Sequence, residues 1–402
     1  MPPYKLAILT SHVIQYQDPL FRQIAAHPDI DLTVLFCDAA GARSYHDRDM
    51  GAQLRWDLEL LQGYRHEFLN NYAPREHGFL RHVNPGIYRT LARGGYDAVL
   101  VMLGWGTLSA WLAFAACEAL ALPFFVYGDN SFIGDDGGVR RRIRRRILSA
   151  LFDRASAFLV CGTMNGDFYA HYGADRQRFF PMPWAIDNDR FSARSTISDS
   201  ERLELRRQHG IPPDRLGIVF AGKLIKRKNP AHLLDAVLAM GHRDRVAVIY
   251  IGDGVERPTL QAYAREHGLS AAYFTGFINQ SELPTAYAMG DIFVLPSSFD
   301  PRGTVTNEAM ACGLPVIVTN MVGVYGEGDI VRHGDNGFVY TVGDIRALAG
   351  HLDALADDDD LRAGMSRRSR ERIAGWSYTS DVEGILAALR MLPGAREGSR
   401  AR

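Results

Sequence analysis

The sequence predicts an α/β protein of two domains, each built on a doubly wound parallel sheet. Short apolar runs alternate with helical stretches, and this alternation occurs twice along the 402 residues. The runs are apolar throughout rather than at every second position, which is typical of strands that helices cover on both faces. A chain of this length is also too long for one ordinary core and suits two domains of roughly 200 residues.

The predicted elements follow one another in a regular order. Each apolar run ends at a polar residue or a glycine, and the helical stretches at residues 231–241 and 258–268 end in glycine, a helix stop signal. The predicted strands are residues 4–11, 31–38, 98–104, 123–129 and 157–162 in the first half, and residues 216–224, 246–254, 272–278, 291–297 and 315–320 in the second half.

The boundary between the domains is expected in the polar stretch at residues 188–201, which has no apolar periodicity and is interpreted as a linker. Residues 1–190 then form the amino-terminal domain, and residues 200–376 form the carboxyl-terminal domain. A final helix at about residues 377–395 is expected to pack back on the amino-terminal domain.

The composition excludes several classes of protein. An apolar content of 47% and a charged content of 23% are those of a soluble globular protein, and a net charge of −1 argues against nucleic-acid binding. The four cysteines include no CxxC pair, so neither a zinc cluster nor a disulfide framework is indicated. The amino terminus lacks a basic region of the kind that precedes a signal peptide, and no apolar span reaches 18 residues. These features predict a cytoplasmic protein.

Residues that suit phosphate binding follow the predicted strands of the second half. In doubly wound sheets ligands bind beyond the carboxyl ends of the strands, and a cleft between two domains is the default site. Glycine lets the backbone approach a ligand closely, and lysine supplies a point charge for phosphate. A helix that begins near Thr304 would aim free N–H groups at a diphosphate, and Glu308 in that helix could accept hydrogen bonds from ribose hydroxyls. The strand-end residues are Gly222, Lys223, Lys228, Gly252, Gly254 and Phe277.

Five motifs of the second half, in this order, resemble the retaining GT-B glycosyltransferases of family 4. They are GKLIKRKNP, GDG, FTGFI, DPRGTVTNEAMACGLPVI and VGVYGEGDIVRHGDNGF, and they cover roughly residues 217–338. The resemblance implies two Rossmann-like domains that face each other across a cleft, the first binding the acceptor and the second the nucleotide sugar. It also implies sugar transfer to a hydroxyl of a glycan, a lipid-linked acceptor or a small molecule, with no metal ion and no cofactor.

The resemblance also implies roles for individual residues. Lys223 and Lys228 grip the diphosphate of the donor and stabilise the charge that grows on it. Glu308 holds the ribose, while Asp300 faces the donor sugar. The remaining donor-binding positions are Gly222, Gly252, Gly254, Gly303, Thr304 and Val305 around the phosphates and sugar, and Phe277 and Ile278 at the base.

Two predicted catalytic positions differ from the usual pattern of the family. Asp300 stands where glutamate is common, so the carboxylate reaches less far by one methylene group. Asp129, in YGDNSF, follows a predicted strand where many members carry a histidine beside the donor sugar, and it is included among the catalytic residues. Both differences bear on which sugar is transferred.

Other motifs have less specific interpretations. The run GIVFAGKL nearly fits a phosphate loop, but Leu224 stands where a hydroxyl should hold magnesium. The turn GDG lacks the third glycine of a dinucleotide fingerprint. The DxD triplets at residues 47–49 and 187–189 are of a kind that metal-dependent transferases of another fold use, yet such triplets are common in surface loops.

The helix from Arg140 to Arg146 has arginines around one apolar face, and two interpretations of it stay open. It is either a solvated helix or a contact with an anionic membrane surface, in which case the inner membrane surface is the alternative location of the protein. A second class of function is also left open. A catalytically inactive nucleotide-sugar-binding subunit of an active enzyme would keep the fold but would not hydrolyse its donor slowly, as an enzyme would.

Overall fold

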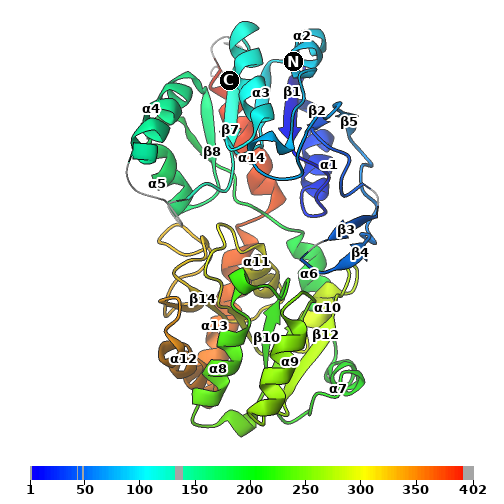
Figure 1. Ribbon diagram of the computed structural model, residues 1–402, viewed down its shortest axis with the longest axis vertical. Coiled ribbons are helices and arrows are strands. Elements are labelled where there is room, and N and C mark those ends of the chain that lie inside the picture. Colours follow the sequence, from blue (N-terminus) through cyan, green and yellow to red (C-terminus); the bar gives the residue numbers. More distant parts are fainter. Residues whose placement is uncertain (1, 43, 48, 132–138, 393–402) are drawn as a thin grey trace, which may run out of the picture. The chain divides into compact units, whose positions relative to one another are not determined.

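The computed structural model describes residues 2–42, 44–47, 49–131 and 139–392, which form two compact units (Figure 1). Unit 1 takes the chain up to Ser44, then Glu59–Trp184, and again the chain from Tyr378 onward. Unit 2 takes Tyr45–Leu58 and Ala185–Ser377. Each unit has its own parallel sheet, as the uniformly apolar runs predict.

The sheet of unit 1 has the strand order β5-β2-β1-β6-β7-β8-β9, and all its pairs are parallel. Every strand predicted in the first half is present. The edge strands β5 and β9 were not predicted, because the first is polar and the second has three residues. The strands are β1 (Tyr4–Thr10), β2 (Ile30–Phe36), β5 (Arg65–Phe68), β6 (Ala98–Val101), β7 (Phe124–Tyr127), β8 (Ala157–Val160) and β9 (Phe179–Pro181).

The last helix of the described residues, α14, belongs to unit 1 and contacts α1, β8 and β9. Its close approach requires Gly384, since a Cβ atom there would lie 1.8 Å from the carbonyl oxygen of Pro181. Residues from 393 onward lie outside the described part of the predicted helix. The helices of unit 1 are α1 (Asp18–Ala26), α2 (Ile87–Gly94), α3 (Leu108–Ala119), α4 (Val139–Arg154), α5 (Thr163–His171) and α14 (Tyr378–Arg390).

The sheet of unit 2 has the strand order β12-β11-β10-β13-β14-β15 and is also parallel. From β10 the chain moves outward through β11 and β12, and then returns to place β13 on the other side of β10. Ligands of doubly wound sheets bind at such a switch point, here between β10 and β13. The strands are β10 (Leu216–Ala221), β11 (Val246–Ile251), β12 (Ala272–Gly276), β13 (Ile292–Leu295), β14 (Val316–Thr319) and β15 (Gly337–Tyr340).

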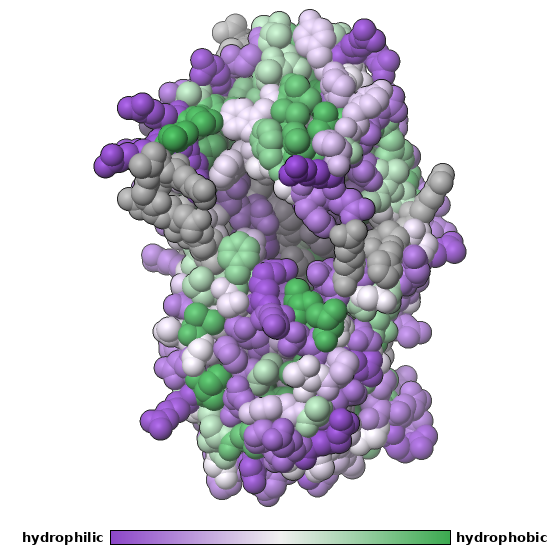
Figure 2. All heavy atoms as spheres, viewed as in Figure 1, coloured by the Kyte–Doolittle hydropathy of each residue, from purple (hydrophilic) through white to green (hydrophobic). Residues whose placement is uncertain are grey.

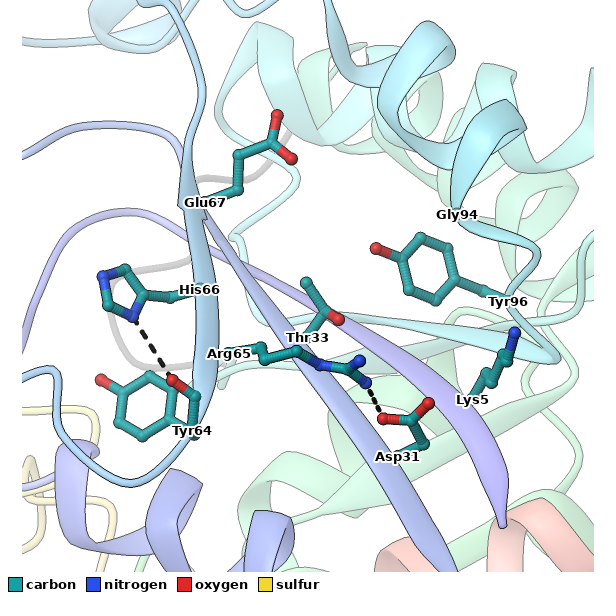
Figure 3. A pocket seen from close by; sticks show the side chains of 9 residues that line it. All are labelled: Lys5, Asp31, Thr33, Tyr64, Arg65, His66, Glu67, Gly94 and Tyr96. Carbon is teal, nitrogen blue, oxygen red and sulfur yellow. Dashed lines mark hydrogen bonds and ion pairs between the residues drawn. The ribbon is translucent and has the colours of Figure 1, made fainter. Parts of the chain in front are cut away.

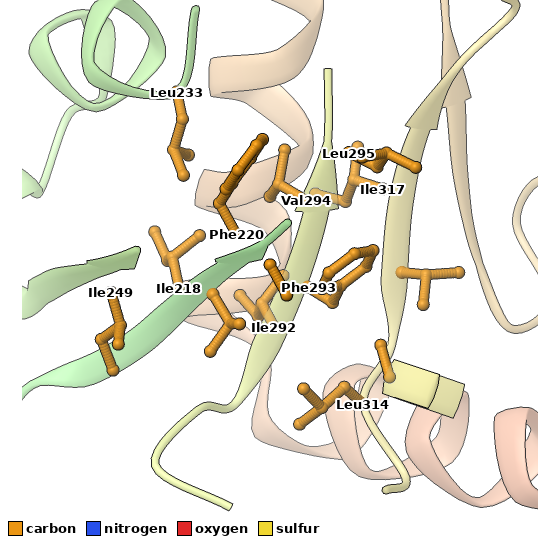
Figure 4. Close-up of a cluster of buried hydrophobic side chains, with 14 of the residues drawn as sticks. Ile218, Phe220, Leu233, Ile249, Ile292, Phe293, Val294, Leu295, Leu314 and Ile317 are labelled. Carbon is orange, nitrogen blue, oxygen red and sulfur yellow. The ribbon is translucent and has the colours of Figure 1, made fainter. Parts of the chain in front are cut away.

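Helices cover both faces of this sheet, because the crossovers on the two sides of the switch point run in opposite directions. Helices α8 and α12 pack together, whereas α11 contacts both α6 and α13. Figure 4 shows part of the apolar core, including Phe220 of β10, Phe293 of β13 and Ile317 of β14. The helices are α6 (Asn188–Ser195), α7 (Asp199–Gln208), α8 (Ala231–Ala239), α9 (Arg257–Glu266), α10 (Leu283–Tyr287), α11 (Thr304–Ala311), α12 (Ile345–Asp357) and α13 (Asp359–Ala374).

The linker expected at residues 188–201 is wrong, because this stretch is largely helical. Asp187 accepts a hydrogen bond from the backbone N–H of Arg190 at 3.1 Å and so caps α6. Ser198 and Glu201 form a capping box that begins α7. Phe191 anchors α6 in the core of unit 2 with 1% of its surface exposed. A single buried aromatic residue produces no apolar period, so the pattern gave no sign of a helix.

A short segment from the first half of the sequence belongs to unit 2. Residues Tyr45–Leu58 contain the antiparallel pair β3 (Tyr45–Asp47) and β4 (Ala52–Leu54). The chain leaves unit 1 before this segment and returns to it afterwards. The short strands are mainly polar, so no apolar run predicted them.

The basic stretch at residues 140–146 lies in helix α4, as predicted; the described side chains of this stretch begin at Arg142. Ile143 and Ile147 are 54% and 45% exposed, and with Phe79, Trp105 and Trp111 they line a hollow of about 560 Å³. On the face drawn in Figure 2, hydrophobic residues form separate small groups within a largely hydrophilic surface. Among the described residues, no helix combines the length and apolar content needed to cross a bilayer.

Candidate active site at the switch point of unit 2

A buried ion pair joins the two strand ends at the switch point. Lys228 closes the short 3₁₀ turn Lys226–Lys228 after β10, and its Nζ contacts Oδ2 of Asp300, which follows β13. The two side chains are 13% and 11% exposed. The backbone N–H of Gly303 donates to Oδ1 of Asp300 at 2.9 Å, so both carboxylate oxygens have a partner. The structure thus brings together three residues that the sequence predicted for the site.

The surroundings of Asp300 keep it ionised. Burial alone would raise the pKa of Asp300, but the Lys228 ammonium, the Gly303 N–H and the charge of Arg227 outweigh burial and lower that pKa below its ordinary value. Near neutral pH the site therefore holds a carboxylate and an ammonium group in contact. An anion that reaches Lys228 meets a cation that is already paired.

Helix α11 begins directly after this pair. Gly303 has φ 50° and ψ 44°, in the left-handed region that favours glycine, and a Cβ atom there would lie 2.6 Å from Cγ1 of Val322. The turn fixes the direction of the first residues of the helix, Thr304 and Val305, which are half-buried. The N–H groups in the first turn of a helix lack partners within the helix and attract anions. The predicted diphosphate position therefore has a helix start and a lysine beside it.

Glu308 lies one turn further along α11 and is 9% exposed. The hydroxyl of Tyr287 donates to its Oε2 at 2.7 Å, and among the described residues no second donor reaches the carboxylate, so Oε1 can accept a bond from a ligand. Burial raises the pKa of Glu308 to about 7, although Tyr287, Arg190 and Lys228 act in the opposite direction. Tyr287 was not predicted from the sequence, because an isolated tyrosine in a helix has no distinguishing signal.

The three glycines at the strand ends serve different purposes. A Cβ atom at Gly252 would lie 2.1 Å from the carbonyl oxygen of Gly222, and one at Gly254 would lie 2.4 Å from that of Leu224. These two glycines let the turns after β10 and β11 lie against each other. Gly222 has φ 128°, and a Cβ atom added there would meet no heavy atom within 4 Å, so space is open beside it.

Lys223 points to a different set of partners from Lys228. Its Nζ lies 2.8 Å from Oδ2 of Asp47 and 3.1 Å from Oδ2 of Asp49. Burial lowers the pKa of Lys223 and the two carboxylates raise it, with a net result above the ordinary value. Asp47 and Asp49 are the acids of the DxD triplet at residues 47–49. Within the described part of the chain, no group of three or more metal-ligating side chains is found.

The predicted base contacts lie after β12. Phe277 is 37% exposed, and its ring centroid lies 6.1 Å from that of Trp56. Ile278 is half-buried and packs against the core of unit 2. Trp56 was not predicted, because it comes from the segment Tyr45–Leu58, which is far from Phe277 in the sequence.

Asp129 belongs to unit 1, where it follows β7 and is exposed. The turn around it is held by Asn165, whose Nδ2 donates to the carbonyl oxygens of Gly128 and Asn130 at 2.9 Å each. Trp105 donates to the side-chain oxygen of Asn130 at 2.9 Å. The turn is therefore well defined within its unit, and the catalytic role of Asp129 stays a prediction.

Figure 3 shows a pocket of about 460 Å³ in unit 1 that contains none of the predicted site residues. Its lining includes Lys5 and Asp31, which are neighbours in register near the amino ends of β1 and β2. Arg65 and Asp31 form an ion pair within it. Because ligands of parallel sheets bind at the carboxyl ends of the strands, this pocket is a poor candidate for the active site.

The sequence of unit 2 matches a known family. Residues 201–372 match the family described as glycosyl transferases group 1. A D-inositol 3-phosphate glycosyltransferase of Corynebacterium urealyticum is 32% identical over 274 residues, which are 66% of this chain and 63% of that protein. The chain spans about half the length of the curated relatives that it matches. These matches confirm the predicted resemblance to glycosyltransferases over this part of the chain, while membership of family 4 and retention of configuration stay predictions.

Solved structures confirm the predicted GT-B fold with its two Rossmann-like domains. Anabaena Alr3699/HepE, crystallised in complex with UDP, has a TM-score of 0.74 at 18% identity, covering 97% of this chain and 100% of that chain. The same protein was also crystallised with UDP-glucose. WaaG, a glycosyltransferase involved in lipopolysaccharide biosynthesis, has a TM-score of 0.66 at 17% identity over 97% of this chain and 100% of that chain.

The raised pKa of Glu308 predicts how stability depends on pH. A carboxyl whose pKa is about 7 in the folded state and 4.5 ordinarily binds its proton more tightly when folded, so stability falls as pH rises between these values. Glu308→Gln cannot titrate and should lose this dependence, which is worth roughly 1–3 kcal/mol between pH 5 and 8. Denaturant unfolding of both proteins at these two pH values measures the difference. Parallel pH profiles of the two proteins would contradict the prediction.

Proposed function

We propose that the protein is a glycosyltransferase that moves a sugar from a nucleotide-sugar donor to an acceptor hydroxyl. The transfer retains the anomeric configuration and uses no metal ion or other cofactor. The observation that carries this proposal is the buried Lys228–Asp300 pair at the switch point, beside the first turn of α11. The family match over residues 201–372 supports the transferase class. The complexes of HepE with UDP and UDP-glucose support a nucleotide-sugar donor.

The donor is held through its three chemically distinct parts. Oε1 of Glu308 accepts a hydrogen bond from a ribose hydroxyl, while Tyr287 holds Oε2. The diphosphate lies against Lys228 and the N–H groups at the start of α11, with Lys223 on its other side. Asp300 accepts from a hydroxyl of the sugar. The base lies against Phe277.

The reaction needs charge stabilisation rather than a protein nucleophile. The bond from the anomeric carbon to the diphosphate oxygen breaks, and its electron pair stays on the diphosphate. Lys228, Lys223 and the helix start stabilise this charge. The acceptor oxygen attacks the same face of the sugar, and its proton passes to the departing phosphate oxygen. The acceptor is a hydroxyl of a glycan, a lipid-linked molecule or a small molecule.

The ion pair provides a test of these roles. Lys228→Ala should weaken nucleoside-diphosphate binding and lower turnover by about 10²-fold, because the ammonium contacts both donor and transition state. It also leaves the buried Asp300 carboxylate without its cation, which costs about 3–5 kcal/mol of stability. The double variant Lys228→Ala/Asp300→Ala should regain most of the stability but not the activity.

The matched control is Lys226→Ala, which removes the same charge from an exposed position in the same turn. Calorimetric binding, turnover and denaturant unfolding are measured on all four proteins. A Lys228→Ala enzyme with the donor affinity and rate of the Lys226→Ala enzyme would remove Lys228 from the site.

A donor panel tests the reaction class and the absence of a metal requirement. The purified protein should slowly release nucleoside diphosphate from its matching nucleotide sugar, and saturating EDTA should change this rate by less than about twofold, because lysines and a helix start neutralise the diphosphate. Proton NMR of the transfer product should show the anomeric configuration of the donor. Tight donor binding without any release would favour the inactive subunit. Activity lost in EDTA and restored by manganese would refute metal independence.

We propose that α4 contacts an anionic membrane surface. The support is the row of exposed arginines Arg142, Arg145 and Arg146 beside the apolar hollow lined by Ile143 and Ile147. The protein should sediment with vesicles of phosphatidylglycerol but not with vesicles of phosphatidylcholine, and high salt should release it. Arg145→Glu/Arg146→Glu should abolish sedimentation. Equal binding to both kinds of vesicle would contradict the proposal and favour the interpretation of α4 as a solvated helix.

A further inference from the structure

The segment Tyr45–Leu58 lies across the nucleotide end of the proposed site. The backbone oxygen of Asp49 accepts from the N–H of Val255, after β11, at 3.2 Å. The backbone oxygen of Arg55 accepts from Nδ2 of Asn279, after β12, at 2.8 Å. The carboxylate of Asp57 accepts from the N–H and the hydroxyl of Ser281. Together with the pairing of Asp47 and Asp49 to Lys223, these contacts span the carboxyl ends of β10, β11 and β12.

Asp47 and Asp49 contact a residue that the proposed function assigns to the donor. Lys223 is expected to bind the diphosphate, yet two carboxylates contact its ammonium group. The side chain of Asp47 is 8% exposed, so its charge is removed from water and depends on Lys223 for compensation. Asp49 is 53% exposed and can turn to solvent at little cost. Asp47 and Asp49 take up two of the three N–H donors of this ammonium group, and their negative charges repel a diphosphate that approaches the third.

We propose that Asp47 and Asp49 are displaceable counter-charges of the donor site, which hold Lys223 in the absence of a nucleotide and are replaced by the diphosphate of the donor. This inference rests on the proposed function for the identity of the donor. It makes the two acids determinants of ligand selection. An anion that binds must offset the loss of the ion pairs of Lys223 with Asp47 and Asp49. A ligand with two phosphates and a base makes more contacts than a single phosphate, so it is favoured.

The placement of Trp56 agrees with this arrangement. Its ring faces Phe277 at the position expected for the base, with the ring planes inclined by 56°. A base that enters against Phe277 therefore contacts the same segment that its diphosphate loosens. Binding of the base and binding of the diphosphate thus both act on the segment Tyr45–Leu58, which contacts Lys223 at one end and Ser281 at the other.

Removing the two acids tests the proposal directly. Asp47→Asn/Asp49→Asn should bind inorganic pyrophosphate about three- to tenfold more tightly than the wild type in calorimetry at moderate salt, because the competing charges are gone. The affinity of the double variant for a nucleoside diphosphate should rise by a similar factor. Adding Lys223→Ala to the double variant should cancel the gain, which shows that it acts through this lysine.

The matched control is Asp57→Asn, which removes a charge from the same segment at a position that contacts Ser281 rather than Lys223. It should change pyrophosphate affinity by less than about twofold, whereas Asp47→Asn alone should raise it. Unchanged or weaker pyrophosphate binding by the double variant overturns the proposal, and so does an equal gain from Asp57→Asn. If pyrophosphate affinity rises as expected but no nucleoside diphosphate binds any variant, the counter-charge role stands and the proposed function fails.

Discussion

The ion pair of Lys228 and Asp300 is the interaction on which the rest of the site depends. It joins the turn after β10 to the turn after β13, at the place where the strand order of unit 2 reverses. Burying two charges costs several kcal/mol for each ion, and their attraction offsets this only when further hydrogen bonds complete the pair. Gly303 supplies one such bond. Apolar residues of similar size would stabilise the fold at least as well, so a function explains the charges better than stability does.

The turn after β10 sends two of its lysines to separate carboxylates, and this division shapes what the site can bind. Lys228 contacts Asp300, and Lys223 contacts Asp47 and Asp49. Both ammonium groups are therefore compensated before a ligand arrives. Under the proposed function, a phosphate that binds there exchanges one anionic partner for another, so the Coulomb energy gained on binding is a difference between two attractions. Affinity then depends on contacts that the carboxylates cannot make, such as those of several phosphate oxygens with the start of α11.

Most of the fold was predictable because strands buried on both faces are apolar throughout, and every predicted run is a strand. Edge strand β9 lacks this signal, since it is three residues long and ends at Pro181, whereas edge strand β12 was predicted. The site was predictable where its residues lie within one turn and helix. It was not predictable where tertiary packing brings side chains from afar. Tyr287 lies 21 residues from Glu308, and Asp47 lies 176 residues from Lys223, and no spacing rule connects such pairs.

The two acids that flank the Gly303 turn differ in chemistry because their surroundings differ. Asp300 has a cation and a backbone N–H in contact, and its pKa lies below the ordinary value. Glu308 is buried to a similar degree and accepts a hydrogen bond from a tyrosine hydroxyl, and its pKa is about 7. Asp300 can therefore only accept hydrogen bonds near neutral pH, whereas Glu308 exists in both protonation states and can accept from or donate to a hydroxyl. A charged acceptor discriminates strongly between hydroxyl positions, because charge-assisted bonds are the stronger ones. These differences support the proposed division, in which Asp300 contacts the sugar and Glu308 contacts the ribose.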